Sequence, residues 1–286
     1  YKRQLLCCMV LTLLPTTAFA ADELPDVKLS IPTTFDKTVD LTKQKKELKI
    51  TDSKTYLIKG SEDPNWYFQY RIKIDGKRKK ITPHIFLDGV RLKAPKDGPA
   101  IELYEGASAC LYFIGNDSEL IGAENFAALQ KNKTDGYLRV LVQTGIKLTC
   151  QGGKYGAGIG GGAMGAGENI TISDGAHVTA NGGAQGAGIG GGGYYGEEKP
   201  GDAENIIIQG YATVDAESGG GGAGIGGGYA GNAKNIIIRG HSKVKATACN
   251  GAAIGGGSAG WSSYYGGSAK AVSYTHLRAH ETPEHL

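Results

Sequence analysis

The heptapeptide Gly-Ala-Gly-Ile-Gly-Gly-Gly occupies residues 156–162, and close copies recur around Ile189, Ile225 and Ile254. A second phrase, Asn-Ile-x-Ile, lies between the copies and begins at Asn169, Asn205 and Asn235. The distance from each Asn to the next heptapeptide Ile is 20, 20 and 19 residues, whereas the stretch after each heptapeptide varies in length. Repeats with one constant spacing and one stretch of variable length are typical of a solenoid.

Each repeat contains two short strand patterns. Ile-x-Ile is followed six residues later by Val-x-Ala, as in Val178–Ala180, and both alternate with a period of two. Such strands are too short to be stable alone, but stacked coils pair them in parallel, about 4.8 Å apart, and pile like side chains into ladders. The recurring Asn is expected to form an amide ladder, and the glycines to supply the sharp corners. These patterns predict a parallel β-helix. We expect it to be right-handed, because crossover connections between parallel strands are almost always right-handed.

The repeat also sets the expected extent of the solenoid. Residues 136–271 contain the regular glycine-rich repeats, and residues 51–135 contain irregular strand patterns that we interpret as earlier coils. Ala127-Ala128-Leu129, for example, is a degenerate heptapeptide, with Leu129 30 residues before Ile159. We expect one all-β domain of about six or seven coils, cut within its last repeat. Residues 21–50 are expected to form an extended lead-in that caps the first coil.

Both ends of the chain resemble translated sequencing adapter. Residues 272–286 match the in-frame translation of a transposase-type sequencing adapter, and residues 1–4 match the inverted end of the same element. We therefore exclude both segments from functional interpretation. This exclusion removes His276, His280 and His285, which would otherwise suggest a metal cluster.

Composition and the first residues indicate the compartment. Residues 5–20 combine an apolar stretch with a terminal Ala-x-Ala, the pattern of a signal peptide whose basic start has been replaced. The apolar stretch is too short to span a membrane. The formal net charge of +3 argues against a nucleic-acid partner. We expect a bacterial protein that is secreted or held at the cell surface.

Motifs for cofactors, metals or catalysis are weak. Gly156-x-Gly158-x-x-Gly161 satisfies the dinucleotide fingerprint, but the βαβ context that the fingerprint requires is missing. The heptapeptide carries no Asp of the kind that calcium-binding repeats need. Asp174, Asp215 and Glu217 come closest to a catalytic set, yet Asp174 and Asp215 occupy different registers of the repeat. We predict no cofactor, no metal site and no catalytic constellation.

Aromatic residues flank the glycine corners. If the variable segments share one side of the solenoid, these rings form an exposed row suited to stacking against sugars. Alternatively, they fold down over bare glycine backbone and shield it. The candidate carbohydrate-binding residues are Tyr155, Tyr194, Tyr195, Tyr229, Trp261, Tyr264 and Tyr265.

The repeat resembles a known group of proteins. Residues 156–162, followed by Asn169-Ile170-Thr171-Ile172 and residues 178–183, are similar to the glycine-rich β-helical repeats of secreted and surface proteins from gut Firmicutes. The resemblance implies carbohydrate-binding or adhesin-like roles. The irregular coils, with Gly98-Pro99-Ala100-Ile101, are similar to a β-helical domain that binds acidic plant polysaccharides with calcium.

Three functions follow as hypotheses. The first is an extracellular, non-enzymatic module that binds a polysaccharide, a surface glycan or host matrix. The second is a polysaccharide lyase or glycoside hydrolase, since parallel β-helices also carry such activities, although fold alone does not decide function. The third is a structural stalk for another module.

Overall fold

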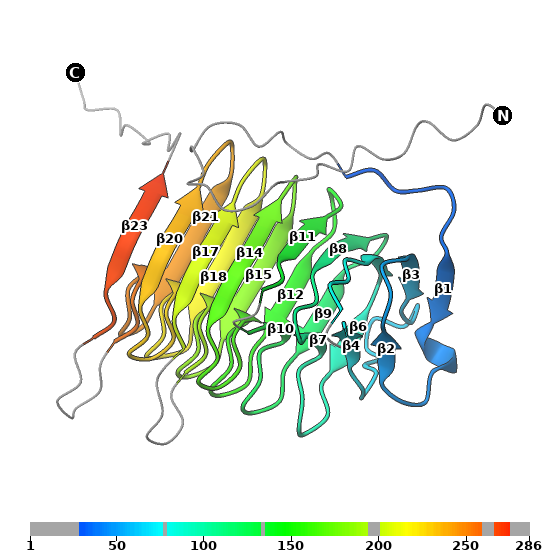
Figure 1. The fold of residues 1–286 in the computed structure, drawn as a ribbon, viewed down its shortest axis with the longest axis horizontal. Coiled ribbons are helices and arrows are strands. Elements are labelled where there is room, and N and C mark those ends of the chain that lie inside the picture. The colour runs from blue at the N-terminus through cyan, green and yellow to red at the C-terminus, as the bar shows by residue number, and fades with distance from the viewer. Residues whose placement is uncertain (1–28, 77–78, 133–134, 194–200, 259–265, 275–286) are drawn as a thin grey trace.

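The chain forms a right-handed parallel β-helix in a computed structural model (Figure 1). The structure describes residues 29–76, 79–132, 135–193, 201–258 and 266–274. Their strands stack along one axis into three parallel sheets, which we name A, B and C. Apart from one turn of 3₁₀-helix, η1 (Leu41–Lys43), the regular elements in these ranges are strands.

The strands of each sheet follow one another along the axis, as their register shows. Sheet A contains β1 (Lys37–Asp40), β3 (Thr55–Lys59), β5 (His84–Asp88), β8 (Ala109–Ile114), β11 (Leu138–Val142), β14 (Gly167–Ser173), β17 (Ala203–Ile208), β20 (Ala233–Ile238) and β23 (Ala269–Tyr274). Sheet B contains β2 (Leu48–Ile50), β4 (Ile72–Asp75), β7 (Ile101–Tyr104), β10 (Leu129–Lys131), β13 (Ile159–Gly160), β16 (Ile189–Gly190), β19 (Ile225–Gly226) and β22 (Ile254–Gly255). Sheet C contains β6 (Arg91–Lys93), β9 (Ser118–Ile121), β12 (Leu148–Gln151), β15 (His177–Gly182), β18 (Thr213–Ser218) and β21 (Lys243–Ala248).

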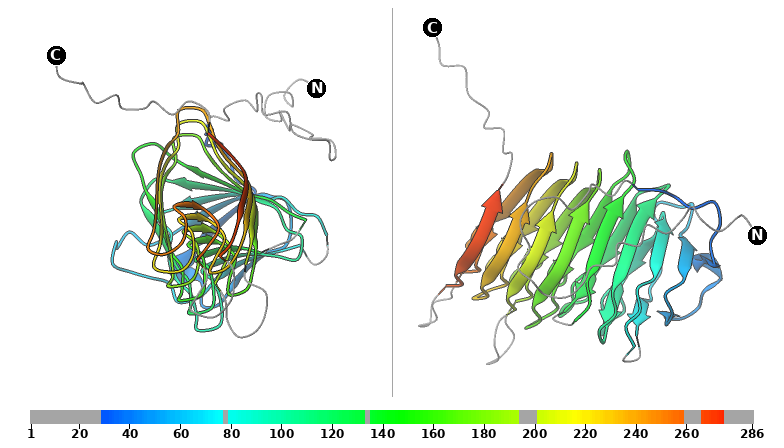
Figure 2. Two further views of the ribbon diagram at one scale, coloured as in Figure 1. Left: turned by 90° about the vertical axis from the view of Figure 1, so that its left-hand side faces the viewer. Right: turned by 45° about the horizontal axis from the view of Figure 1, so that its top comes forward.

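Each complete coil passes through the sheets in the order A, C, B. In the described part of the chain, six coils between β5 and β22 contribute a strand to all three sheets. Two earlier coils, β1–β2 and β3–β4, contribute only to sheets A and B, and Phe68 in the second forms a single bridge to Leu92 of β6. The end-on view in Figure 2 shows the successive coils superposed. The predicted fold class is confirmed; the six complete coils agree with the predicted six or seven, and the two earlier coils are additional to them.

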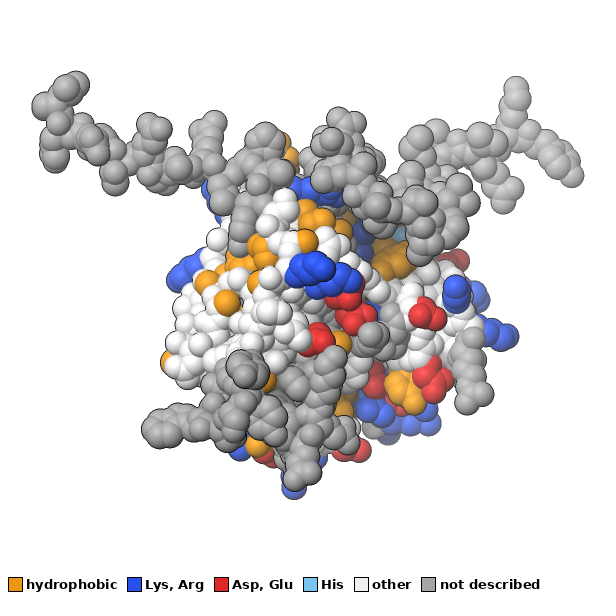
Figure 3. Space-filling view, turned by 60° about the vertical axis from the view of Figure 1, so that its left-hand side comes forward, with side chains coloured by type: hydrophobic (Ala, Val, Ile, Leu, Met, Phe, Trp, Pro, Cys, Tyr) orange, Lys and Arg blue, Asp and Glu red, His pale blue; other side chains and the backbone are white. Residues whose placement is uncertain are grey.

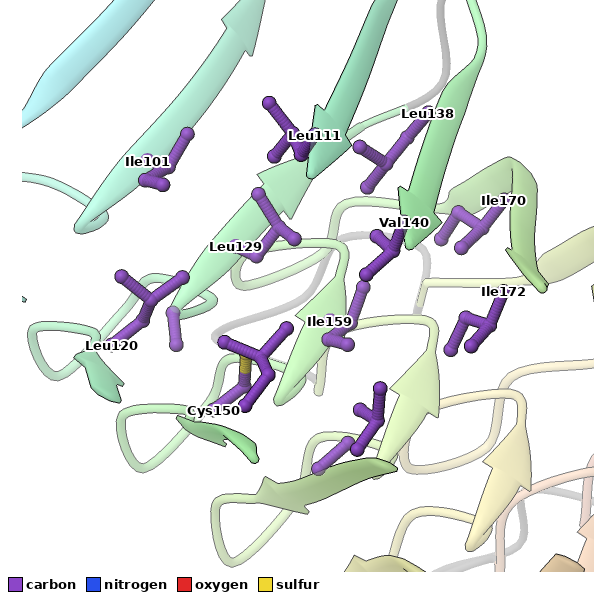
Figure 4. Close-up of a cluster of buried hydrophobic side chains, with 14 of the residues drawn as sticks. Ile101, Leu111, Leu120, Leu129, Leu138, Val140, Cys150, Ile159, Ile170 and Ile172 are labelled. Carbon is purple, nitrogen blue, oxygen red and sulfur yellow. The ribbon is translucent and has the colours of Figure 1, made fainter. Parts of the chain in front are cut away.

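The core consists of stacked aliphatic columns. Leu129, Ile159, Ile189 and Ile225 pair in register in sheet B and are fully buried, and Ile254 continues the column. Figure 4 shows side chains of all three sheets, including Leu129, Val140 and Cys150, converging inside the coil. Burying each such side chain stabilises the fold by roughly 1.5–3 kcal/mol. The vertical alignment predicted from the repeat is therefore observed.

The predicted asparagine ladder is also present. Asn205 Nδ2 donates to Asn169 Oδ1 at 2.9 Å, and Asn235 Nδ2 donates to Asn205 Oδ1 at 2.7 Å. All three residues have φ between 54° and 56°, a left-handed conformation that asparagine tolerates better than most residues. They do not precede the strand, as the sequence pattern suggested, but bend β14, β17 and β20 from within. Asparagine is thus favoured because its amide continues the ladder and because its backbone tolerates the left-handed conformation.

The heptapeptide glycines lie differently from our expectation. We expected sharp corners, which ordinarily lie at the surface, but Gly160, Gly190 and Gly226 are buried, with φ of 134–140°. A Cβ on Gly190 would lie 2.0 Å from the carbonyl oxygen of Gly226 in the next coil. The corners are buried because successive backbones stack directly on one another.

The first described residues do more than cap a coil. Residues 37–50 of the expected lead-in form β1, η1 and β2, so the sheets begin before residue 51. Residues 29–36, which we call the strap, run along sheet A: the Leu29 backbone N–H donates to the Asp174 carboxylate, and the Phe35 ring packs edge-on against Phe86, with centroids 5.3 Å apart. The strap therefore links β14 to the first coil.

The last described strand reaches the adapter-like segment. Residues 272–274 belong to β23, where Val272 pairs with Ile236 of β20. The pairing continues the alternation of sheet A. The assignments of residues 1–4 and 272–286 to an adapter and of residues 5–20 to a signal peptide stay predictions, because they fall wholly or mostly outside the described residues.

Candidate functional site

The outer face of sheet C is open and polar. Its inward side chains, such as Leu120, Cys150 and Ala180, are fully buried, and the alternate side chains face solvent. Two long in-register columns of these outward side chains, which we call the sheet C face, run along the axis beside a shorter column of His177, Thr213 and Lys243. One column contains Arg91, Glu119, Thr149, Thr179, Asp215 and Lys245, and the other contains Lys93, Ile121, Gln151, Asn181, Glu217 and Thr247. Except at Ile121, the face thus presents hydrogen-bonding groups at a rung spacing of about 4.8 Å.

Two aromatic residues, Trp66 and Tyr67, lie next to β6, the first strand of sheet C. The bridge between Phe68 and Leu92 places Tyr67 beside Arg91 on the outer side. The Tyr67 hydroxyl donates to Glu119 Oε2 at 2.5 Å, and this bond to a carboxylate, together with burial, raises the pKa of Tyr67. Trp66 is 57% exposed. Our sequence interpretation missed Trp66 and Tyr67 because it examined only aromatics next to the glycine repeats; the local sequence Pro64-Asn65-Trp66-Tyr67 was the available signal.

A polar cavity of about 420 Å³ opens beside the same end. Arg91 of the sheet C face lines it together with Glu62, Asn116 and Asp117. Asp117 Oδ1 accepts a hydrogen bond from the Lys147 backbone at 2.8 Å, so one acid is already engaged. Among the described residues, no three His, Cys, Asp or Glu side chains meet in a way that could hold a metal ion.

The other two outer faces offer fewer free groups. On sheet A, the outward side chains of Phe86 and Leu141 are buried, and Phe35 of the strap packs against Phe86. On sheet B, the outward positions of β13, β16 and β19 are the buried glycines. The side seen in Figure 3 shows acidic and basic side chains close together, and the Lys234–Glu204 ion pair of 2.5 Å illustrates such pairing. Sheet C therefore presents the most accessible regular array among the described residues.

The predicted aromatic row can be followed at two positions. Tyr155 is half-buried, with Lys154 Nζ 4.8 Å from its ring centroid. Tyr229 is also half-buried, and its ring lies 2.4 Å from where a Cβ of Gly221 would be. Tyr229 thus covers bare glycine backbone, as the shielding alternative predicts. Tyr194, Tyr195, Trp261, Tyr264 and Tyr265 lie outside the described residues, so a row of seven rings stays a prediction.

The acids considered for catalysis are dispersed. Asp215 and Glu217 share the outer side of β18, whereas Asp174 lies at the end of β14 and accepts from the strap. A denser charged group lies outside sheet B, where Arg71 Nε contacts Glu47 and Arg71 Nη1 lies 3.6 Å from Glu102 Oε2. Burial raises the pKa of Glu102, and the positive charge of Arg71 partly opposes this rise. The hollow beside this group, about 260 Å³, is lined by Glu47, Asp97 and Arg71, with the two carboxylates flanking an already paired guanidinium.

Lys131 is the one charged side chain buried among the described residues. It points inward at the end of β10, in register with Leu103, and its Nζ donates to the Asn132 carbonyl at 3.0 Å. Burial lowers the pKa of Lys131 to about 8. Between pH 8 and the ordinary value near 10.5, the unfolded amine binds more protons than the folded one. Stability should therefore rise with pH across this window.

Replacing Lys131 with methionine should remove this dependence. We expect Lys131→Met to be more stable than the wild type below pH 8, by at most roughly 3 kcal/mol, since one pKa unit corresponds to about 1.4 kcal/mol. Urea denaturation at pH 7 and pH 10.5 measures the difference, with Lys93→Met on the exposed face as the control. An equal pH slope in the wild type and Lys131→Met would contradict the assignment.

Comparison with known proteins supports the architecture. The family model described as a β-helix repeat matches residues 170–193, 206–229 and 236–258. Each match begins at the first Ile of an Asn-Ile-x-Ile phrase. No curated protein and no solved structure matches the chain significantly. No helix in the described ranges is long and apolar enough to cross a membrane.

Proposed function

We propose that this β-helix repeat protein is a non-catalytic module that binds a glycan chain lying along the sheet C face. The in-register polar columns carry this proposal: Thr149 and Thr179 are neighbours in one column, and Gln151 and Asn181 in the other. A hydroxyl-rich polymer can exchange hydrogen bonds with such side chains at successive rungs. Trp66 and Tyr67 add aromatic surface suited to a sugar ring at one end.

Repetition supports a polymer over a small ligand. Each coil from β6 to β21 adds the same two outward positions to the sheet C face. A ligand with its own repeating units would meet equivalent positions several times, so weak single contacts would add up along one chain. The extracellular, adhesin-like setting is part of this proposal and depends on the predicted signal peptide at residues 5–20.

The double variant Gln151→Ala/Asn181→Ala tests the central contacts. Each lost hydrogen bond costs about 0.5–1.5 kcal/mol, so we expect the affinity for a glycan found on an array to fall roughly 5- to 160-fold. Trp66→Ala should also weaken binding, whereas Tyr137→Ala, whose side chain is 43% exposed next to sheet A, should not. Titration calorimetry measures the affinities, and thermal melts establish that each variant is folded.

Three outcomes would contradict the proposal, and the last two would favour another function. If the double variant binds as tightly as the wild type, the sheet C face is not the contact surface. If the protein shortens its ligand, the charged group around Arg71 becomes the place to look for a lyase or hydrolase site. If no glycan or matrix component binds, the stalk hypothesis is favoured.

A further inference from the structure

The charges of the sheet C face are arranged symmetrically about an uncharged centre. The central strands β12 and β15 present Thr149, Gln151, Thr179 and Asn181. Acidic side chains follow on the strands at either side, with Glu119 on β9 and Asp215 and Glu217 on β18. The basic side chains of the two columns follow one strand further out, at Arg91, Lys93 and Lys245. The neighbouring outward column carries His177 on β15 and Lys243 on β21. A ligand centred on this face therefore meets neutral groups first and carboxylates next.

The acidic side chains are not equally compensated. Glu119 lies in register beside Arg91 and accepts the Tyr67 hydroxyl. Asp215 lies in register beside Lys245. Glu217 is exposed, and its two neighbours in the column are the uncharged Asn181 and Thr247. Glu217 therefore projects the least screened negative charge next to the uncharged centre.

The central side chains retain hydrogen-bonding capacity for a neutral ligand. The Thr179 hydroxyl oxygen is buried and has no hydrogen-bond partner within the described structure, although Thr179 as a whole is half-exposed. Rotating this hydroxyl toward a ligand would break no protein bond. Gln151 Nε2 donates only to its neighbouring Gly152 carbonyl, at a long 3.3 Å. The Gln151 amide can therefore turn to a sugar hydroxyl at little cost, whereas the Thr179 hydroxyl reaches one only after rotation about χ1.

We infer that the glycan taken by the sheet C face is uncharged, and that Glu217, assisted by Asp215, excludes polymers of uronic acids. This inference rests on the proposed function and specifies its ligand. A uronate carboxylate beside Glu217 would be repelled, whereas the hydroxyls of a neutral sugar could donate to the same carboxylate. The resemblance of the early coils to a domain for acidic polysaccharides points the other way, so the two expectations can be separated by experiment.

The test compares a neutral β-glucan with polygalacturonate in titrations at low salt. The wild-type protein should bind the neutral polymer at least roughly tenfold more tightly. Asp215→Asn/Glu217→Gln should strengthen binding of polygalacturonate by roughly 5- to 25-fold, with about fivefold for each like charge removed. The gain should shrink as salt is raised, because salt screens exposed charges. The double variant Asp97→Asn/Glu105→Gln changes the net charge equally away from sheet C and should leave the preference unchanged.

The results separate this inference from the proposed function. Polygalacturonate binding as tight as neutral binding in the wild type would overturn the inference and leave glycan binding intact. An unchanged preference in Asp215→Asn/Glu217→Gln, or an equal gain in the Asp97/Glu105 variant, would also overturn it. Failure to bind either polymer, or any member of a wider neutral panel, would overturn the proposed function and this inference with it.

Discussion

Replacing Gly190 with alanine is expected to be among the most damaging single methyl additions in the regular coils. Gly190 has φ of 134°, which L side chains rarely adopt, and its new Cβ would lie 2.0 Å from the Gly226 carbonyl oxygen. Gly160 and Gly226 face the following coil in the same way, so a shift that relieves one clash creates another. We expect a loss of at least roughly 3 kcal/mol, from the strained backbone and the separation of stacked strands.

A second glycine separates conformation from contact. Gly106 also has a positive φ, 72°, but a Cβ there would meet no atom within 4 Å. Gly106→Ala should therefore cost only the left-handed penalty of about 1–2 kcal/mol. Urea denaturation followed by circular dichroism gives both values. Equal losses in Gly106→Ala and Gly190→Ala would show that close stacking of the coils is not what requires glycine at residue 190.

The alternation within β17 predicts the second large effect. Ile208 is fully buried and pairs with Ile172 and Ile238 in the neighbouring coils. Ile208→Ala should destabilise the protein by about 2–5 kcal/mol, because the rigid ladder cannot collapse to fill the cavity. Its neighbour Ile207 faces outward and is half-buried. Ile207→Ala should cost less than about 1 kcal/mol.

This pair of variants has the same chemistry and differs only in the face of the strand. Chemical denaturation of Ile207→Ala and Ile208→Ala under the same conditions isolates the contribution of the inner position. A larger loss for Ile207→Ala than for Ile208→Ala would mean that β17 is placed with the opposite face inward. In that case the register of the repeat would be wrong by one residue.

The amino-acid sequence by itself determined the regular part of the solenoid. The Ile189 and Ile225 column, the Asn205 ladder and the stacking of Leu129 on Ile159 were all predicted from spacing. Spacing was sufficient because each coil repeats the same local alternation, and parallel stacking in register is the arrangement that buries every apolar side chain of the repeat together.

The tertiary structure alone decided which surfaces are free. The strap packs Phe35 against Phe86 and follows sheet A, the heptapeptide glycines are buried by backbone stacking, and Trp66 stands exposed beside the sheet C face. No local pattern encodes these facts, because the exposure of an outer face depends on segments distant in the chain that lie across it. Periodicity therefore fixed what faces inward, whereas the exposed candidate site emerged only once all coils and the strap were placed together.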